Sequence, residues 1–165
     1  MNPGQRLRAT AEPDLGAPPP PWGERSWGGT PPDEVLQDDG SARLVLPGLP
    51  ESVGTARSYT RAFVADWMPG VTGEQLDDLR LIVSELVTNA VRYGTEPGDS
   101  LLVVLAVRDR TVRVEVHDPV RRVPRVRGES VERERGRGLR ILGVLARWGI
   151  EERPLGKVVW AEPRW

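Results

Sequence analysis

The sequence predicts an α+β fold: a two-layer sandwich in which helices cover one face of a mostly antiparallel sheet. Three observations carry this prediction. Two successive stretches show apolar residues at helical spacing, two later pairs of β-rich runs are each separated by a short turn, and a further helical stretch lies between those pairs. Short turns between neighbouring strands produce antiparallel pairs, and the helices must then bury their apolar faces against the sheet.

Residues 1–40 are predicted to be a disordered arm in front of one folded domain at residues 41–165. The arm holds eight prolines and six glycines, and three arginines against seven acidic residues. A segment of this composition has too little apolar surface to offset the entropy that is lost when it becomes ordered.

The domain is predicted to begin with a short strand and two helices. The strand is expected at 43–46, where an apolar run ends at a Pro-Gly pair. The first helix, 51–68, also ends at a Pro-Gly pair. Thr72 then starts the second helix as its N-cap, Gln75 completes a capping box, and Gly94 ends the helix.

The second half of the domain is predicted to contain two hairpins with a loop and a helix between them. Runs 100–108 and 111–118 are joined by a two-residue turn. The arginine-rich residues 119–136 are expected to form a mobile loop, and residues 138–148 a third helix closed by a glycine. The second hairpin is expected at 150–153 and 156–161.

Composition excludes several classes of function. The chain has no cysteine and one histidine, which excludes disulfide scaffolds, thiolate zinc sites, cysteine nucleophiles and multi-histidine metal sites. A formal net charge of −1 gives no reason to expect nucleic-acid binding. The longest apolar run, 101–107, is far shorter than the ~20 residues of a membrane-spanning helix, and no secretory signal pattern is visible. We therefore expect a cytoplasmic protein without nucleic-acid or membrane contacts.

The second predicted helix has a group of polar residues beside its apolar face, and packing of the core does not account for them. Glu85, Asn89 and Arg92 fall together on one side of its apolar face. Glu85 and Asn89 are four residues apart, so their side chains meet, and a carboxylate with an amide oxygen suits Mg²⁺. Pairs of this kind are also common at a solvated helix boundary, so both interpretations stay open.

Asp118 ends the predicted strand 111–118 in an unusual position. It continues the face formed by three alternating valines, which is expected to pack under the helices. An acid at that place is costly unless a group donates hydrogen bonds to it, as an adenine amino group would. Alternatively, Asp118 could cap the turn that begins at Pro119.

A glycine-rich segment, Gly136, Arg137, Gly138 and Leu139, opens the third predicted helix. Glycines at such a place let the backbone approach a ligand closely, and the free N–H groups of a helix start favour phosphate. Glycine-rich turns are common, so this motif discriminates poorly without the others.

The motifs and their order resemble the histidine-kinase-like ATPase superfamily, which has the Bergerat ATP-binding fold. The string SELVTNAVRYG at 84–94 is similar to the N box of the anti-sigma-factor serine/threonine kinases. Segments 136–139, 145–149 and 156–160 are similar to the small stand-alone actinobacterial members of that branch. The resemblance covers about residues 42–162, which is essentially the whole predicted domain.

The resemblance implies a role for each motif. Asn89 would coordinate Mg²⁺ between the ATP phosphates, Glu85 would act as general base, and Asp118 would accept the adenine amino group. The glycine-rich segment would wrap the phosphates, with the preceding loop as the ATP lid. The implied nucleotide-binding set is Asn89, Arg92, Asp118, Gly136, Arg137, Gly138 and Leu139.

The resemblance also implies a reaction and partners. The γ-phosphate of ATP would pass to a serine or threonine of an anti-anti-sigma-type antagonist protein. A sigma factor is a further expected partner, and a homodimer is a possible assembly.

Two motifs depart from the family pattern. Its G1 box reads Asp-x-Gly-x-Gly, whereas Pro119-Val120-Arg121-Arg122 follow Asp118 here, and proline and valine restrict the backbone. Tyr93 also stands where close relatives often have histidine. The alternative is therefore a non-catalytic module that sequesters a regulatory partner, with nucleotide as a structural ligand or absent. Retained Glu85 favours the kinase, and the altered G1 box favours the module.

Overall fold

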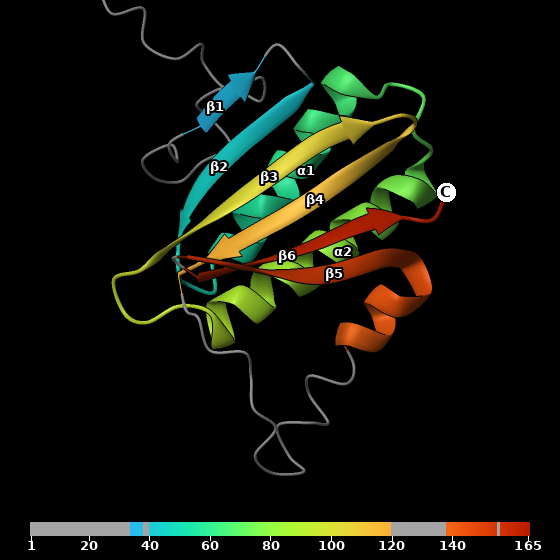
Figure 1. The fold of residues 1–165 in the computed structure, drawn as a ribbon. Coiled ribbons are helices and arrows are strands. Elements are labelled where there is room, and N and C mark those ends of the chain that lie inside the picture. Colours follow the sequence, from blue (N-terminus) through green and yellow to red (C-terminus); the bar gives the residue numbers. More distant parts are fainter. Residues whose placement is uncertain (1–33, 38–39, 120–137, 155) are drawn as a thin grey trace, which may run out of the picture.

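The computed structural model describes residues 34–37, 40–119, 138–154 and 156–165, which form an α+β fold (Figure 1). Six strands make one sheet in the order β1-β2-β3-β4-β6-β5, and all five pairings are antiparallel. Helices lie along one face of this sheet (Figure 1). The predicted fold class is confirmed.

The elements follow the predicted order after an added first strand. Their bounds are β1 (Glu34–Gln37), β2 (Ser41–Pro47), α1 (Ser52–Trp67), α2 (Gly73–Tyr93), β3 (Ser100–Arg108), β4 (Thr111–Asp118), β5 (Ala146–Arg153) and β6 (Gly156–Pro163). A further helix covers 138–145, between β4 and β5. Within the described residues, no helix is both long enough and apolar enough to cross a membrane.

β1 lies inside the segment that was predicted to be an arm. It pairs antiparallel with β2, from Glu34 opposite Leu44 to Gln37 opposite Ser41. Gly40 turns the chain with a φ of 76° and packs against Trp67. Composition averaged over forty residues does not detect a four-residue strand, because its pairing depends on a neighbour in space. Residues 1–33 lie outside the described part of the chain, so the arm stays a prediction there.

The two long helices begin and end where the sequence predicts. Thr72 Oγ1 accepts a hydrogen bond from the Gln75 amide at 3.2 Å, and Gln75 Oε1 accepts one from the Thr72 amide at 2.9 Å. This is the predicted capping box. Gly94 follows the last turn, and its N–H donates to the Ala90 carbonyl. These bounds place the polar flank of Glu85, Asn89 and Arg92 within α2, as predicted.

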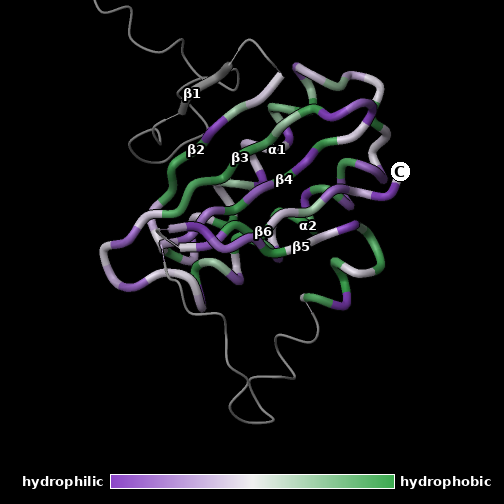
Figure 2. Tube along the Cα trace, viewed as in Figure 1, coloured by the Kyte–Doolittle hydropathy of each residue, from purple (hydrophilic) through white to green (hydrophobic). Residues whose placement is uncertain are grey.

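The core lies between α1, α2 and the inward face of the sheet. Every second residue of β4 is buried, as are Leu101, Val103 and Leu105 of β3, and β3 is hydrophobic along most of its length (Figure 2). Burying one such large apolar side chain contributes about 1.5–3 kcal/mol. α2 supplies the largest set of helical core residues: Leu79, Ile82, Val83, Leu86, Val87 and Ala90.

The third helix is shorter than predicted. We expected it to reach Trp148, but it ends at residue 145 and β5 begins at Ala146. Pairing with β6 places Arg147 opposite Glu162, and their side chains form an ion pair of 3.0 Å. Gly149 packs tightly on the Trp160 ring. These contacts join distant parts of the chain, so helical periodicity alone could not reveal that this segment belongs to the sheet.

The outward face of β4 carries an ion-pair network. Arg113 contacts Glu115 at 2.8 Å and Glu162 at 3.1 Å, and its guanidinium lies 4.2 Å from the centre of the Trp160 ring. Burial lowers the pKa of Arg113, but its hydrogen bonds and charge contacts with Glu115 and Glu162 raise it overall. Burial raises the pKa of Glu115, but Arg113 and His117 hold it below its ordinary value. His117 also belongs to this outer face, since its Nε2 lies 3.0 Å from Glu115 Oε2.

Candidate functional site

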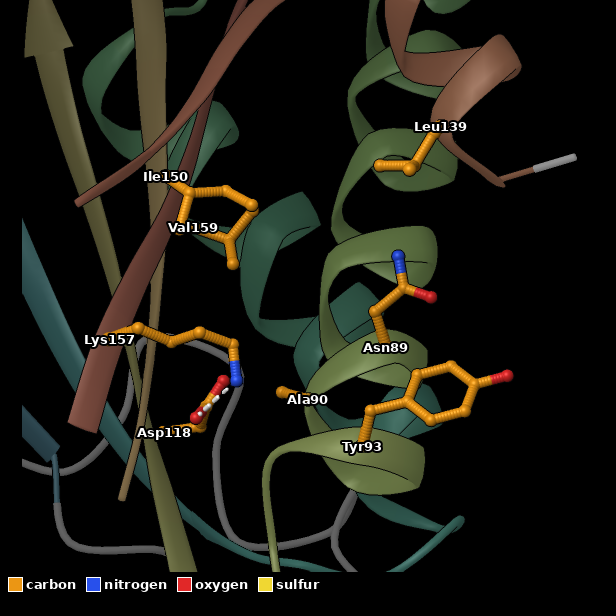
Figure 3. A pocket seen from close by; sticks show the side chains of 8 residues that line it. All are labelled: Asn89, Ala90, Tyr93, Asp118, Leu139, Ile150, Lys157 and Val159. Atoms are coloured by element: carbon orange, nitrogen blue, oxygen red, sulfur yellow. Dashed lines mark hydrogen bonds and ion pairs between the residues drawn. The ribbon is translucent and has the colours of Figure 1, made fainter. Parts of the chain in front are cut away.

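A cleft opens between α2, the start of helix 138–145 and the strands β4, β5 and β6 (Figure 3). It holds about 520 Å³ of space outside protein atoms, part of it open to solvent. Predicted residues from three separate motifs line it, one each from α2, β4 and helix 138–145. The lining residues are Asn89, Ala90, Tyr93, Asp118, Leu139, Ile150, Lys157 and Val159.

Asp118 is buried on the sheet side of this cleft. Only 1% of its side chain is exposed, and the Lys157 ammonium donates to its Oδ1 at 2.8 Å. The two residues are register partners on β4 and β6, so both side chains lie on the helix-facing side of the sheet. The alternation of β4 therefore predicted the direction of Asp118 correctly.

Lys157 is a residue of the cleft that the sequence motifs did not predict. Two signals were available: it is the one lysine in a chain with 22 arginines, and it stands in a β-rich run immediately before two valines. Neither signal identifies Asp118 as its partner, because the two residues are 39 positions apart in sequence. Only the register of β4 and β6 joins them.

Two glycines press closely on Asp118. A Cβ at Gly94 would overlap the Asp118 carboxylate, and a Cβ at Gly156 would overlap the Asp118 backbone carbonyl. The G1-box glycines are missing after Asp118 in the sequence. Two other glycines, Gly94 and Gly156, nevertheless lie against this residue. Glycines from α2 and β6 allow close backbone approach around it in space.

We expect Gly156→Ala to lower the free energy of unfolding by about 3–5 kcal/mol. Gly156 has a φ of 116°, and its Cβ would also meet the backbone of Asp118, so strain and steric overlap add. Gly98→Ala is the matched control, since its φ is 93° but no atom lies within 4 Å of its Cβ position; its expected cost is about 1–2 kcal/mol of strain. Urea denaturation measures both, and equal losses would contradict the proposed overlap.

The polar flank of α2 lies directly against the start of helix 138–145. A Cβ placed on Gly138 would be 2.5 Å from Glu85 Oε2 and 3.7 Å from Asn89 Nδ2. The first N–H groups of a helix have no partner within the helix and carry a partial positive charge. The structure thus brings Glu85 and Asn89 close to Gly138, the first described residue of helix 138–145.

Some predicted residues do not join the cleft. Arg92 is exposed on α2 and is not among the lining residues. Gly136 and Arg137 lie outside the described residues, as does nearly all of the predicted lid at 119–136. Their assignment to the nucleotide stays a prediction.

The lining of the cleft combines apolar side chains with a few polar ones. Leu139 on the helix side and Ile150 and Val159 on the sheet side offer apolar surface in the upper part of the view, with the Asp118–Lys157 pair below them on the sheet and Asn89 on α2 (Figure 3). In the described residues, no three His, Cys, Asp or Glu side chains gather to hold a metal. A metal at Asn89 would therefore take other ligand oxygens from the bound molecule or from water.

Comparison with known families identifies the domain. Residues 46–162 match the histidine kinase-like ATPase domain family. The chain belongs to this family. Membership confirms the resemblance that the N-box and glycine motifs predicted, and an ATPase domain implies ATP binding.

Individual relatives of this histidine kinase-like ATPase domain are anti-sigma F factors. That of Shouchella clausii (strain KSM-K16) is 34% identical over 77 residues, which are 46% of this chain and 51% of the relative. That of Clostridium perfringens (strain SM101 / Type A) is 37% identical over 67 residues, 41% of this chain and 46% of the relative. The chain spans about half the length of the curated relatives it matches. These matches agree with the anti-sigma-factor branch that the N box indicated.

Proposed function

We propose that the protein is an ATP-dependent serine/threonine kinase of the anti-sigma-factor type, which phosphorylates an antagonist protein. The observation that carries this proposal is the meeting of Glu85, Asn89 and Gly138 at the edge of a cleft that also contains buried Asp118. A base, an amide oxygen and a helix N-terminus are the groups that phosphoryl transfer from ATP requires. The anti-sigma F factor relatives support the choice of acceptor class.

In this proposal the nucleotide spans the cleft from sheet to helix. Asp118 accepts the adenine amino group, and Leu139, Ile150 and Val159 contact the base. Asn89 holds Mg²⁺, which when bound neutralises charge on the phosphates. The remaining proposed phosphate contacts come from Gly136, Arg137, Gly138 and, from outside the cleft, Arg92.

Glu85 acts as general base in the proposed reaction. Its carboxylate takes the proton of a serine or threonine hydroxyl on the partner, whose oxygen forms a bond to the γ-phosphorus. The bond from that phosphorus to the β–γ bridging oxygen breaks, and ADP leaves. Catalysis then rests on the position of the reactants and on charge stabilisation at the phosphates.

The proposed partners follow from the same assignment. The acceptor is an anti-anti-sigma-type protein, and a sigma factor is released or captured according to the state of that protein, which regulates transcription. A cytoplasmic location and a homodimer remain predictions.

A second candidate function is a non-catalytic module that sequesters its partner. Two observations favour it: Asp118 is already engaged by Lys157, and Val120 and Arg122 stand where the G1 box has glycines. The two candidates differ in one result, because only a kinase transfers labelled phosphate to the partner.

We expect calorimetry to show Mg-ATP binding, and Asn89→Ala to weaken it about 10-fold or more, because an amide oxygen at the metal is lost. Without magnesium, the parent protein and the variant should bind ATP equally weakly. Thr88→Ala, a change at the neighbouring residue that does not line the cleft, is the control. Absence of any ATP heat or thermal stabilisation at millimolar nucleotide would contradict ATP binding.

A further inference from the structure

A second hollow lies at the end of the sheet opposite the cleft of Asn89 and Asp118. It is formed by the end of α1, the start of α2, the turn between β3 and β4 and the segment after β6 (Figure 1). It holds about 840 Å³ of space outside protein atoms, part of it open to solvent. We call it the tryptophan groove, and its lining includes Trp67, Gly70, Val71, Gln75, Arg110 and Trp165.

Trp67 forms a fixed aromatic wall of the tryptophan groove. Its ring stacks with Phe63 at a centroid separation of 6.4 Å, and it lies 3.8 Å from the position that a Cβ on Gly40 would occupy. The residue is nevertheless 39% exposed. Trp165 is partly buried and packs against the core. Two indoles that are held by their neighbours form a preorganised surface for a ligand with flat apolar faces.

The groove also offers hydrogen-bond donors. The capping box fixes the Gln75 side chain, because its Oε1 accepts from the Thr72 amide at 2.9 Å. The Nε2 group of the same amide has no partner within the described part of the chain. Arg110 adds a guanidinium from the turn between β3 and β4. Such donors suit a ligand whose backbone carbonyls are not paired within the ligand itself.

The arm in front of β1 contains a segment that matches this lining. Residues 18–21 are four consecutive prolines, and Trp22 follows them. A run of this kind favours the polyproline II helix, which has no internal hydrogen bonds and leaves its carbonyls free. Proline-rich segments dock into aromatic-lined grooves, and the preformed helix loses little conformational entropy there. Docking of this kind needs no core, so it is compatible with the composition that predicts a disordered arm.

The connection between the proline run and the sheet has a suitable length. β1 begins at Glu34, and Gly40, which lies against Trp67, is six residues further on, a span of at most about 22 Å. Residues 23–33, taken as a flexible linker, have a root-mean-square end-to-end distance of about 17–20 Å. A linker that matches the span gives an effective concentration in the millimolar range. The arm of the same chain is therefore favoured over a second copy.

We propose that the tryptophan groove docks the proline run 18–21 of its own chain, with proline rings on the indoles of Trp67 and Trp165. The inference is independent of the proposed function. Gln75 lies at the start of α2, and Asn89 is 14 residues further along the same helix, which corresponds to about 21 Å. Docking thus ties the arm to the domain at the end remote from the cleft.

Paramagnetic labelling tests this proposal on the full chain. The sequence has no cysteine, so Ala17→Cys gives one attachment site for a nitroxide directly before the proline run. Labelling with ¹⁵N-tryptophan gives one indole signal for each of the six tryptophans, and single Trp→Phe variants identify them. We expect the nitroxide to broaden the signals of Trp67 and Trp165 several-fold more than that of Trp160. Trp160 is the internal reference, since it lies with Arg113 on the outward face of the sheet.

Two glycines provide a matched pair of groove variants. Gly70 lines the groove, and no atom lies within 4 Å of its Cβ position, so Gly70→Glu adds a charged side chain there without overlap in the fold. This variant should reduce the broadening at Trp67 to the level of Trp160. Gly73→Glu is the control, because its Cβ position is equally open but the residue does not line the groove; it should keep the parental broadening.

The arm is tested in the same way. Replacement of all four prolines at 18–21 by serine should remove the excess broadening at Trp67. Pro3→Ser combined with Pro13→Ser changes two isolated prolines of the same arm and should have no effect.

Mixed samples distinguish the other occupants. Nitroxide-labelled chains without ¹⁵N are mixed with ¹⁵N-labelled chains that lack the cysteine. Broadening of Trp67 in this mixture as strong as within one chain would assign the groove to the arm of a second copy and overturn docking within the chain. Equal broadening of Trp67 and Trp160, or broadening that persists in Gly70→Glu, would also overturn it. If the arm leaves Trp67 unaffected but a free polyproline peptide shifts its signal, the groove belongs to a proline-rich partner, and the proposal is again wrong. The kinase assignment stands in each case.

Discussion

Glu85→Gln is expected to reduce phosphoryl transfer to the partner protein by about 10²- to 10⁴-fold, the usual contribution of a general base. Glutamine keeps the shape of the side chain against Gly138 but cannot take a proton from the acceptor hydroxyl. Binding of ATP should change by less than about threefold, because the proposed base acts on the acceptor. The measurement is the transfer of label from γ-labelled ATP to a partner isolated by pull-down with the parent protein.

Glu74→Gln is the control for this experiment. Glu74 lies on the same helix but in its first turn, where it is exposed. Transfer by Glu85→Gln at the parental rate would remove Glu85 from the role of base. A variant that no longer binds ATP would instead assign Glu85 to the nucleotide, and absence of transfer by the parent would favour the sequestering module.

Asp118→Asn is expected to lower the free energy of unfolding by about 3–5 kcal/mol. The substitution removes the carboxylate from a buried pair in which the Lys157 side chain is 8% exposed, and breaking a buried ion pair by removing one partner has a cost of this size. Urea denaturation of the nucleotide-free protein measures the effect. ATP affinity should fall in the same variant, because an asparagine amide offers a weaker acceptor to the adenine amino group.

Two further variants test the cause of this instability. Asp118→Asn combined with Lys157→Met removes both charges and should recover most of the lost stability. Asp77→Asn breaks an exposed pair with Arg80, 3.2 Å apart, and should cost less than about 1 kcal/mol. If the single and double variants at 118 and 157 were equally unstable, the buried charge would not be the reason.

The parts of the fold that sequence reasoning predicted depend on local interactions. The capping box of Thr72 and Gln75 acts within one helical turn, and its hydrogen bonds are present as expected. The turn at Asp109 likewise joins strands that are adjacent in sequence, and the positive φ of Asp109 is the conformation such a turn uses. Strand alternation then placed Asp118 on the buried face.

The parts that it missed depend on partners distant in sequence. β1 exists because β2 offers an edge, and the segment after residue 145 becomes a strand because β6 pairs with it. In the site, the family resemblance placed Glu85 and Gly138 at the same nucleotide, whereas the contact of Lys157 with Asp118 was not predicted.

From its residues alone, this chain could be assigned its two long helices, its two hairpins, the direction of Asp118 and the polar flank of α2, because spacing and capping act over a few residues. Folding in three dimensions settled which strands are neighbours, where the last helix stops and which cation meets the buried acid. Those outcomes arise from strand register and from the burial of charge. Both depend on contacts between segments that are far apart in the sequence.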